Sequence, residues 1–324
     1  MSSKEIEAAN IFQPALMVGL GEILWDLLPS GKELGGAPAN FAYMANVLGD
    51  EGIVASRTGK DNLALEARSA MEGLGLNPSF IQEDDQHPTG VVKVLIDGAG
   101  QPEFTILSDV SWDYLEWTTA WADLAARAKV ICFGTLAQRS QVSRTTVHLF
   151  LEASRNSTLK IYDVNLRQSF YSKDILVDSL RLSNIVKLNA DELAKVCDLL
   201  GIPGRTEEEQ AKRLLINYRL ELVCITRGAG GSLLVSDDQT VEHKGFKVGV
   251  ADAIGTGDAF TACLAHHYVR GRSLHTISER ANGFASWVAT QIGATPTVPP
   301  QGLLGVLDEI MQEQASNESA RGSR

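Results

Sequence analysis

Cysteine is scarce in this sequence, and its few copies are scattered. The four cysteines, Cys132, Cys197, Cys224 and Cys263, form no C-x-x-C pair, and each lies in or beside an apolar run. This pattern excludes a disulfide framework and favours buried free thiols. It is typical of a reducing compartment, so we expect a cytoplasmic protein. None of the six histidines stands in an H-E-x-x-H sequence, which argues against a zinc hydrolase.

Basic residues and long apolar runs are also lacking. The 324 residues include 29 basic and 40 acidic side chains, for a formal net charge of −11. A surface of this sign repels nucleic acid and anionic lipid, so we expect neither as a partner. No apolar run is long enough to span a bilayer, and residues 1–10 lack the apolar core of a signal peptide. A nucleotide is compatible with this charge, because backbone amides and metal ions hold phosphates locally.

Strands and helices alternate along most of the chain. Short apolar runs predict buried strands at 16–20, 53–56, 130–133, 159–164, 185–188 and 222–226. Helical spacing predicts helices at 38–48, 62–74, 112–128, 142–153, 174–182, 190–200 and 207–218. Such alternation indicates a mostly parallel sheet with helices on both faces. Ligands bind such sheets at the carboxyl ends of the strands, so we expect functional residues just after the strands.

Two hairpins interrupt the alternation. Runs of β type at 91–96 and 104–107 flank the turn sequence Asp97-Gly98-Ala99-Gly100, which predicts a small β substructure outside the main sheet. A second hairpin is predicted from 232–235 and 240–243. Two helices, at about 258–270 and 274–291, follow it.

The sharpest local pattern is the glycine-rich stretch Asp252-Ala253-Ile254-Gly255-Thr256-Gly257-Asp258 before the penultimate helix. Glycines at 255 and 257 allow a tight turn and close approach to a ligand. The unpaired amides of the following helix start can hold a phosphoryl oxygen. Asp258 has two readings from sequence alone: an acid that stabilises the first turn of the helix, or a base that accepts a proton from a hydroxyl group.

Three further segments place polar groups after strands or at a helix start. Gly35 and Gly36 precede a helix that contains Asn40, whose amide can reach a ligand. Asp26 follows the first strand, where a carboxylate can accept hydrogen bonds from sugar hydroxyls. Asn165 and Arg167 end another strand, and Arg167 suits either a hydroxyl or a phosphate. Each has an ordinary structural alternative: a loop-to-helix junction, a turn-forming acid, or a surface ion pair.

Together these segments resemble the PfkB/ribokinase family of carbohydrate kinases. The resemblance rests on GGAPANFAYMANVLG at 35–49, on 252–260, and on three shorter stretches at 163–167, 187–192 and 226–231, in the family order. It implies a single ribokinase-like α/β domain over 1–324, with a doubly wound, mostly parallel sheet flanked by helices. It also implies a small β-sheet lid, inserted from about 22–36 and 89–109.

The resemblance assigns roles to individual residues. Asp258 would be the catalytic base, and Gly255, Thr256 and Gly257 would form the anion hole. Asn189 and Glu192 match the family's N-x-x-E motif, in which Glu192 would organise Mg²⁺ through water; a capping pair is the structural alternative. ATP would bind through the residues Asn189, Thr226, Gly228 and Gly231, with Asn282 and Ser286 beside the adenine.

One departure from the family concerns a monovalent cation. Family members often carry hydroxyl residues where this chain has Ala253 and Ile254. Asp252 and backbone carbonyls are then the groups left to bind K⁺. The chain also has no G-x-x-x-x-G-K-[ST] sequence, so it is not a P-loop enzyme.

The stretches at 21–29 and 133–139 look most like fructokinases, which implies fructose and ATP as substrates. Other hexoses and 2-keto-3-deoxygluconate stay open; a sugar carboxylate would be favoured if Arg139 and Arg167 converge. Two other classes compete. Gly19-Leu20-Gly21 hints at a nicotinamide-dependent oxidoreductase, although Leu24 leaves G-x-G-x-x-G incomplete. A non-catalytic sugar-binding protein would not need Asp258. Exposed lid edges further predict a homodimer.

Overall fold

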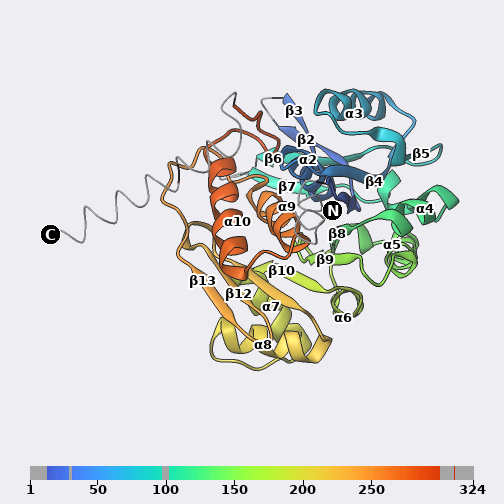
Figure 1. Cartoon of the computed structure of the whole chain (residues 1–324). Helices are drawn as coiled ribbons and strands as arrows, with labels where there is room; N and C mark the ends of the chain where they lie inside the picture. Colours follow the sequence, from blue (N-terminus) through green and yellow to red (C-terminus); the bar gives the residue numbers. More distant parts are fainter. Residues whose placement is uncertain (1–12, 29–30, 97–101, 300–309, 311–324) are drawn as a thin grey trace, which may run out of the picture.

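The computed structural model describes residues 13–28, 31–96, 102–299 and 310 (Figure 1). Its largest element is a nine-stranded sheet of order β13-β12-β11-β10-β9-β8-β1-β4-β5. The strands are β1 (Leu16–Leu20), β4 (Glu51–Gly59), β5 (Ile81–Asp84), β8 (Val130–Gly134), β9 (Leu159–Asp163), β10 (Ile185–Asn189), β11 (Leu222–Thr226), β12 (Ser232–Val235) and β13 (Thr240–His243). The strands from β11 to β5 run parallel, and β12 pairs antiparallel with both of its neighbours, β11 and β13. The predicted α/β class and mostly parallel sheet are confirmed.

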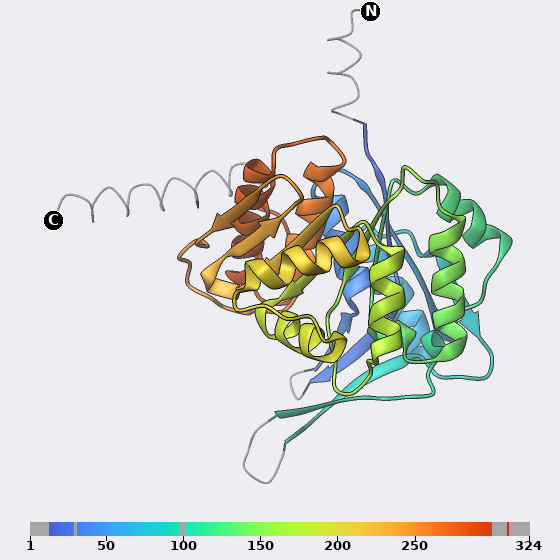
Figure 2. The same ribbon diagram turned by 90° about the horizontal axis from the view of Figure 1, so that it is seen from below.

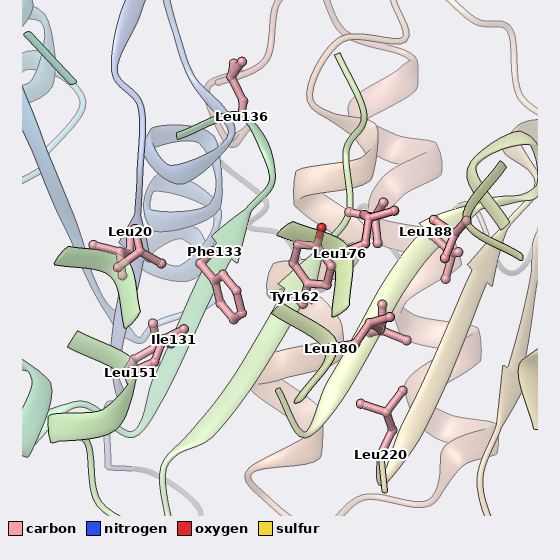
Figure 3. Packing of buried hydrophobic residues seen from close by; sticks show 14 of the residues in the cluster. Leu20, Ile131, Phe133, Leu136, Leu151, Tyr162, Leu176, Leu180, Leu188 and Leu220 are labelled. Atoms are coloured by element: carbon pink, nitrogen blue, oxygen red, sulfur yellow. The ribbon is translucent and has the colours of Figure 1, made fainter. Parts of the chain in front are cut away.

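Helices cover both faces of this sheet (Figure 1). One face carries α2 (Ala37–Val47), α9 (Thr256–Tyr268) and α10 (Leu274–Ala289), and the other carries α4 (Thr119–Arg127), α5 (Gln141–Ala153), α6 (Lys173–Leu182), α7 (Ala190–Leu200) and α8 (Glu207–Tyr218). Alternate residues of a strand point to opposite faces. Along β8, Val130 accordingly belongs to one hydrophobic cluster and Ile131 to the other. Figure 3 shows the second face, where Phe133 and Tyr162 of neighbouring strands stack at 5.3 Å between ring centroids.

A separate four-stranded sheet, called here the small sheet, has the order β3-β2-β6-β7. It consists of β2 (Leu24–Leu28), β3 (Gly31–Gly35), β6 (Gly90–Ile96) and β7 (Pro102–Ile106), which project from the main body (Figure 2). These strands come from the two segments in which the sequence predicted a β insertion. The predicted turn at 97–100 lies outside the described residues.

Local polar groups explain where several helices begin. Side-chain oxygens accept a hydrogen bond from a backbone N–H in the first turn at the N-caps Asp61, Thr118, Ser172, Asn189, Thr206 and Ser273. Asp61 starts α3 (Asn62–Gly73). Within the part of the chain that the structure describes, no helix has the length and apolarity to cross a membrane.

The helix predicted over 112–128 is wrong in its first half. Residues Ser111–Tyr114 form a short 3₁₀ helix, and α4 begins only at Thr119. The fully buried Trp112 and Leu115 hold this segment against the core, so tertiary packing overrides the helical spacing. The edge strand β5 was not predicted, because its sequence IQED has no apolar run.

Candidate active site

The polar residues that follow the strands gather at one edge of the main sheet. Asp163, Asn189 and Thr226 end the neighbouring strands β9, β10 and β11. Asn189 and Thr226 are register partners, and Lys187 pairs with Asp163 in the same way. This parallel alignment brings distant sequence segments to one edge, as the sequence predicted.

A cavity of about 1040 Å³ lies between this edge and the small sheet. Its lining takes residues from β2, β3, β6 and β7 on one side and from the helix starts and strand ends on the other. Nine residues singled out from the sequence line it: Asp26, Gly35, Gly36, Asn40, Asn165, Arg167, Gly255, Gly257 and Asp258. The segments around residues 26, 40 and 258, far apart in the sequence, therefore meet at one cavity.

Asp258 stands in the first turn of α9, three residues after the N-cap Gly255. Its Oδ2 accepts a hydrogen bond of 2.8 Å from Nδ2 of Asn40. Burial, and next the charge of Asp163, raise the pKa of Asp258 to about 6, although Asn40, Lys187 and Arg167 oppose this rise. A carboxylate with this pKa is ionised at neutral pH and close enough to it to accept a proton from a hydroxyl.

The turn from 252 to 257 is fixed by contacts with a second loop. Gly255 has a φ of 76°, and a Cβ there would lie 2.8 Å from Cα of Ala294. Asp252 accepts hydrogen bonds from N–H of Ile254 (3.0 Å) and of Gly293 (3.1 Å), so its carboxylate joins the two loops. Thr256 donates its hydroxyl hydrogen to the carbonyl of Ala253 and does not line the cavity. Its contribution to an anion hole is limited to its backbone N–H, which makes a long contact of 3.4 Å with the same carbonyl.

Sequence reasoning missed Lys187. Its Nζ lies 3.0 and 3.1 Å from the two carboxylate oxygens of Asp163, and 2.9 Å from the position that a Cβ at Gly257 would take. Thr261 donates a further hydrogen bond to Asp163. An ammonium group therefore lies directly beneath the glycine turn. The signal that pointed to it was a lysine within the apolar strand IVKLN.

Glu22 was also missed. It follows β1, is only 4% exposed, and lines the same cavity. Its Oε2 has no hydrogen-bond partner among the described residues. Burial, and to a smaller extent the charge of Asp258, raise the pKa of Glu22 to about 7, with Arg167 opposing them. An acid directly after a fully apolar strand was the signal available in the sequence.

The small sheet supplies Asp26, which is half-buried in β2. On β3, Gly35 pairs with Leu24 and lies diagonally across from Asp26, and a Cβ at Gly35 would approach Oδ2 of Asp26 within 2.5 Å. Glycine at 35 thus leaves room for the carboxylate. Burial, and next the charge of Glu33, raise the pKa of Asp26, whereas Arg167 lowers it. Arg167 itself is exposed and lines the cavity from the main sheet.

Arg139 corrects one expectation, because it is not part of the cavity lining. Its side chain is 6% exposed and forms an ion pair with Asp113, at 2.7 Å between Nε and Oδ1. The guanidinium lies between the rings of Trp112 and Phe170. Arg139 and Arg167 therefore do not converge on one ligand. The sequence did not reveal that Asp113 satisfies this charge.

The residues expected to bind nucleotide lie outside the cavity lining, along the neighbouring strand ends and α10. Asn189 and Glu192 form a capping box, the structural alternative weighed above. Gly228 and Gly231 have left-handed φ values, and Gly231 packs against the carbonyl of His243. Asn282 is buried and donates to Ser232 and Ser278, whereas Ser286 is half-buried on α10. The amide nitrogen of Asn282 thus serves the packing of α10 on β12.

Glu192 is the acidic residue expected to organise Mg²⁺. Its carboxylate oxygens accept hydrogen bonds from N–H of Leu166 (2.8 Å) and of Asn189 (2.9 Å). No group of three or more carboxylate, histidine or cysteine side chains suited to a metal occurs among the described residues. This donor set suits Mg²⁺ held mainly by phosphates and water, with one protein carboxylate nearby.

A family model described as pfkB family carbohydrate kinase matches residues 30–301. The chain belongs to this family. It is a sugar kinase, and the alternative of a nicotinamide-dependent oxidoreductase is wrong. The glycine pair behind that alternative serves packing instead: a Cβ at Gly19 would lie 2.1 Å from the carbonyl oxygen of Pro38, so only glycine lets α2 approach β1.

Individual relatives agree with the family assignment. The chain is 30% identical over 262 residues to a fructokinase of Salmonella typhimurium, covering 76% of this chain and 81% of that protein. It is 26% identical over 308 residues to the sugar kinase PH1459 of Pyrococcus horikoshii, covering 89% and 94%. The crystal structure of PH1459 superimposes with a TM-score of 0.78, over 91% of this chain and 99% of that one.

A fructokinase of Xylella fastidiosa with bound ATP matches with a TM-score of 0.79 at 20% identity, over 93% of this chain and 99% of that one. At this identity the likeness concerns the fold. The fold of this family kinase is ribokinase-like, as the resemblance implied.

Proposed function

We propose that this family kinase transfers the γ-phosphate of ATP to a primary hydroxyl of a neutral hexose, with fructose giving fructose 6-phosphate. The proposal is carried by one observation: the carboxylate of Asp258 lies in the cavity beside the glycine turn, with Asn40 as its hydrogen-bond partner. Proton acceptor and phosphate-binding amides are then next to each other, as in-line phosphoryl transfer requires.

The chain's own groups account for each change in bonding. A sugar hydroxyl in the cavity gives its proton to Asp258 as its oxygen bonds to the γ-phosphorus. The bond from that phosphorus to the β-phosphate oxygen breaks, and ADP leaves. N–H groups of Gly255, Thr256 and Gly257 at the start of α9, together with the ammonium of Lys187 beneath them, stabilise the negative charge of the transferring phosphoryl group.

The nucleotide would extend from the glycine turn along the neighbouring strand ends. In this proposal Asn189, Thr226, Gly228 and Gly231 contact the phosphates, and Asn282 and Ser286 lie near the adenine. Mg²⁺, held through water by Glu192, would neutralise phosphate charge when bound. A monovalent cation, K⁺, would bind the carboxylate of Asp252, which already accepts hydrogen bonds from two backbone amides.

The charges of the cavity favour a neutral sugar over a sugar acid. Four acids line it, Glu22, Asp26, Glu33 and Asp258, of which Glu22 is only partly ionised at neutral pH, and three basic residues, Lys32, Arg167 and Lys187, so the lining has no excess of positive charge to attract an anion. With Arg139 outside the lining, the pair of arginines that would bind a carboxylate of 2-keto-3-deoxygluconate is missing from the cavity. Asp26 can accept hydrogen bonds from two hydroxyls, and fructokinases occur among the relatives.

The small sheet would act as a lid in this proposal. It closes one side of the cavity through Leu24, Val92 and Ile106, so its movement onto the main sheet would exclude water from the phosphate. The outer edges of β3 and β7 are the ends of the small sheet and suit pairing with a second copy of the chain. Sedimentation that finds only monomer at working concentration would contradict such a homodimer.

Coupled kinetics with ATP and a panel of fructose, glucose, ribose and 2-keto-3-deoxygluconate tests the substrate. Faster turnover of 2-keto-3-deoxygluconate than of fructose would refute the choice of sugar. Asp258→Asn should lower kcat by about 10²–10⁴-fold while sugar binding, measured by calorimetry, persists. Asp174→Asn removes an exposed first-turn acid of α6 and serves as the matched control. Unchanged turnover in Asp258→Asn would refute the mechanism and favour a different base.

A further inference from the structure

Arg139 occupies an unusual position behind the cavity wall. The guanidinium carbon lies 3.9 Å from the ring centroid of Trp112 and 4.6 Å from that of Phe170. Two nitrogens pair with the carboxylate of Asp113, at 2.7 Å for Nε and 2.8 Å for Nη2. Nη2 also donates to the carbonyl of Leu107. One buried side chain therefore contacts four residues from three separate segments.

Arg139 and two of the residues that it contacts, Leu107 and Phe170, adjoin residues of the cavity lining. Leu107 follows Ile106, the last residue of β7 and part of the lining. Arg139 donates its own N–H to the carbonyl of Leu136, a second lining residue. On the third side, N–H of Phe170 donates to the carbonyl of Arg167, which lines the cavity from the end of β9.

The segments joined in this way belong to different parts of the fold. Ile106 ends the small sheet, whereas Leu136 and Arg167 follow strands β8 and β9 of the main sheet. The guanidinium of Arg139 thus connects the segment that follows β7 to two loops of the main sheet. The planar fork of arginine satisfies the carboxylate, the carbonyl and both ring faces at once; the ammonium of lysine cannot.

We propose that Arg139 is a positioning residue for the sugar, which sets the relative placement of Ile106, Leu136 and Arg167 without touching the substrate. This inference rests on the proposed function of the cavity. A buried ion pair by itself is weak evidence for a stabilising role, because desolvation offsets the attraction between the charges. The contacts with Leu107 and Phe170 connect the ion pair of Arg139 and Asp113 to the residues that shape the sugar side of the cavity.

The test compares Arg139→Lys and Arg139→Met with the wild type, using the sugar of the panel that turns over fastest. We expect KM for the sugar to rise about tenfold, with kcat and KM for ATP within about twofold, because only binding on the sugar side is lost. Phe170→Leu, which removes one stacking face and keeps the ion pair, should raise KM for the sugar less. Arg144→Met is the matched control: it removes an ion pair between Arg144 of α5 and Asp178 of α6, neither of which lines the cavity, and should leave KM for the sugar unchanged.

Melting temperatures of all variants separate positioning from stability. A lowered melting temperature with unchanged KM for the sugar in both Arg139 variants would overturn the inference and leave a purely structural role. If neither Arg139 variant folds, Phe170→Leu decides: an unchanged KM for the sugar overturns the inference, and a raised one supports it. A wild type that phosphorylates no sugar overturns the proposed function and this inference with it, whereas failure of the variants alone leaves the proposed function intact.

Discussion

Nδ2 of Asn40 donates a hydrogen bond of 2.8 Å to Oδ2 of Asp258, across 218 positions of sequence. The two residues lie near the starts of α2 and α9, helices that pack on the same face of the main sheet. A hydrogen bond to the ionised carboxylate favours that form and works against the effect of burial. Asn40 thereby lowers the pH at which the proposed base becomes available.

The pH dependence of turnover follows from this contact. A base acts when it has lost its proton, so with a pKa of about 6 the wild-type kcat/KM should be level above that pH and fall below it. Asn40→Ala removes a group that lowers the pKa of Asp258, and the acidic limb should move to higher pH. Profiles of kcat/KM from pH 5 to 8 measure the shift. Asn46→Ala, at the other end of α2, is the control; an unshifted limb in Asn40→Ala would show that Asp258 does not control it.

Lys187 should matter for both stability and catalysis. Lys187→Met leaves the carboxylate of Asp163 buried without its ion partner, which should cost about 3–5 kcal/mol in the free energy of unfolding. It also removes positive charge beneath the glycine turn, so kcat should fall. The double variant Asp163→Asn, Lys187→Met should regain stability in urea unfolding without regaining kcat. Recovery of kcat in the double variant would mean that Lys187 only neutralises Asp163.

Gly255 is needed both for its backbone conformation and for its small size. Alanine at a left-handed φ costs about 1–2 kcal/mol, and at position 255 it would also collide with Ala294. Gly255→Ala should therefore lose stability and displace the turn amides, lowering kcat. Gly271→Ala is matched to it: φ there is 64°, and no atom lies within 4 Å of the added Cβ. Coupled assays should find Gly271→Ala fully active; equal activity of the two variants would contradict the role of the turn.

The carboxylate of Asp50 makes the free energy of unfolding depend on pH. Burial alone would raise its pKa, but hydrogen bonds from His266, Arg270 and N–H of Ala15 outweigh burial and lower it from 3.8. A lowered pKa means that the stabilisation is complete above about pH 4 and is lost as pH falls through the folded-state pKa. Asp50→Asn should therefore cost about 3–5 kcal/mol in the free energy of unfolding at pH 7, and the difference should narrow below pH 4.

Urea unfolding at pH 7, 5 and 3.5 measures this difference. The control is Asp85→Asn, which removes an exposed ion pair with Lys60 and should leave the free energy of unfolding nearly unchanged, because water screens exposed charges. A difference between wild type and Asp50→Asn that stays constant across this pH range would contradict the linkage.

The sequence predicted the elements whose patterns are local. The hairpin of β12 and β13 and the helices α7 and α8 have the expected bounds. Predictions from the sequence failed where contacts with residues distant in the sequence determine the structure. The segment around Trp112 has helical spacing but forms only a short 3₁₀ helix packed against the core. Arg139 looked free because Asp113, 26 residues away, is not recognisable as its partner. Lys187 and Glu22 were overlooked for the same reason. Their burial distinguishes them from ordinary surface charges, and burial is known only from the fold.

The small sheet enters the fold as two insertions that leave the order of the main strands untouched. These insertions contain Asp26, Val92 and Ile106. The main body contains Asp258, the glycine turn and Lys187. Under the proposed function, the sugar contacts made by the small sheet and the groups that transfer phosphate are therefore encoded in separable stretches of the gene. Transplanting residues 24–35 and 90–106 together would exchange the former and leave the latter in place.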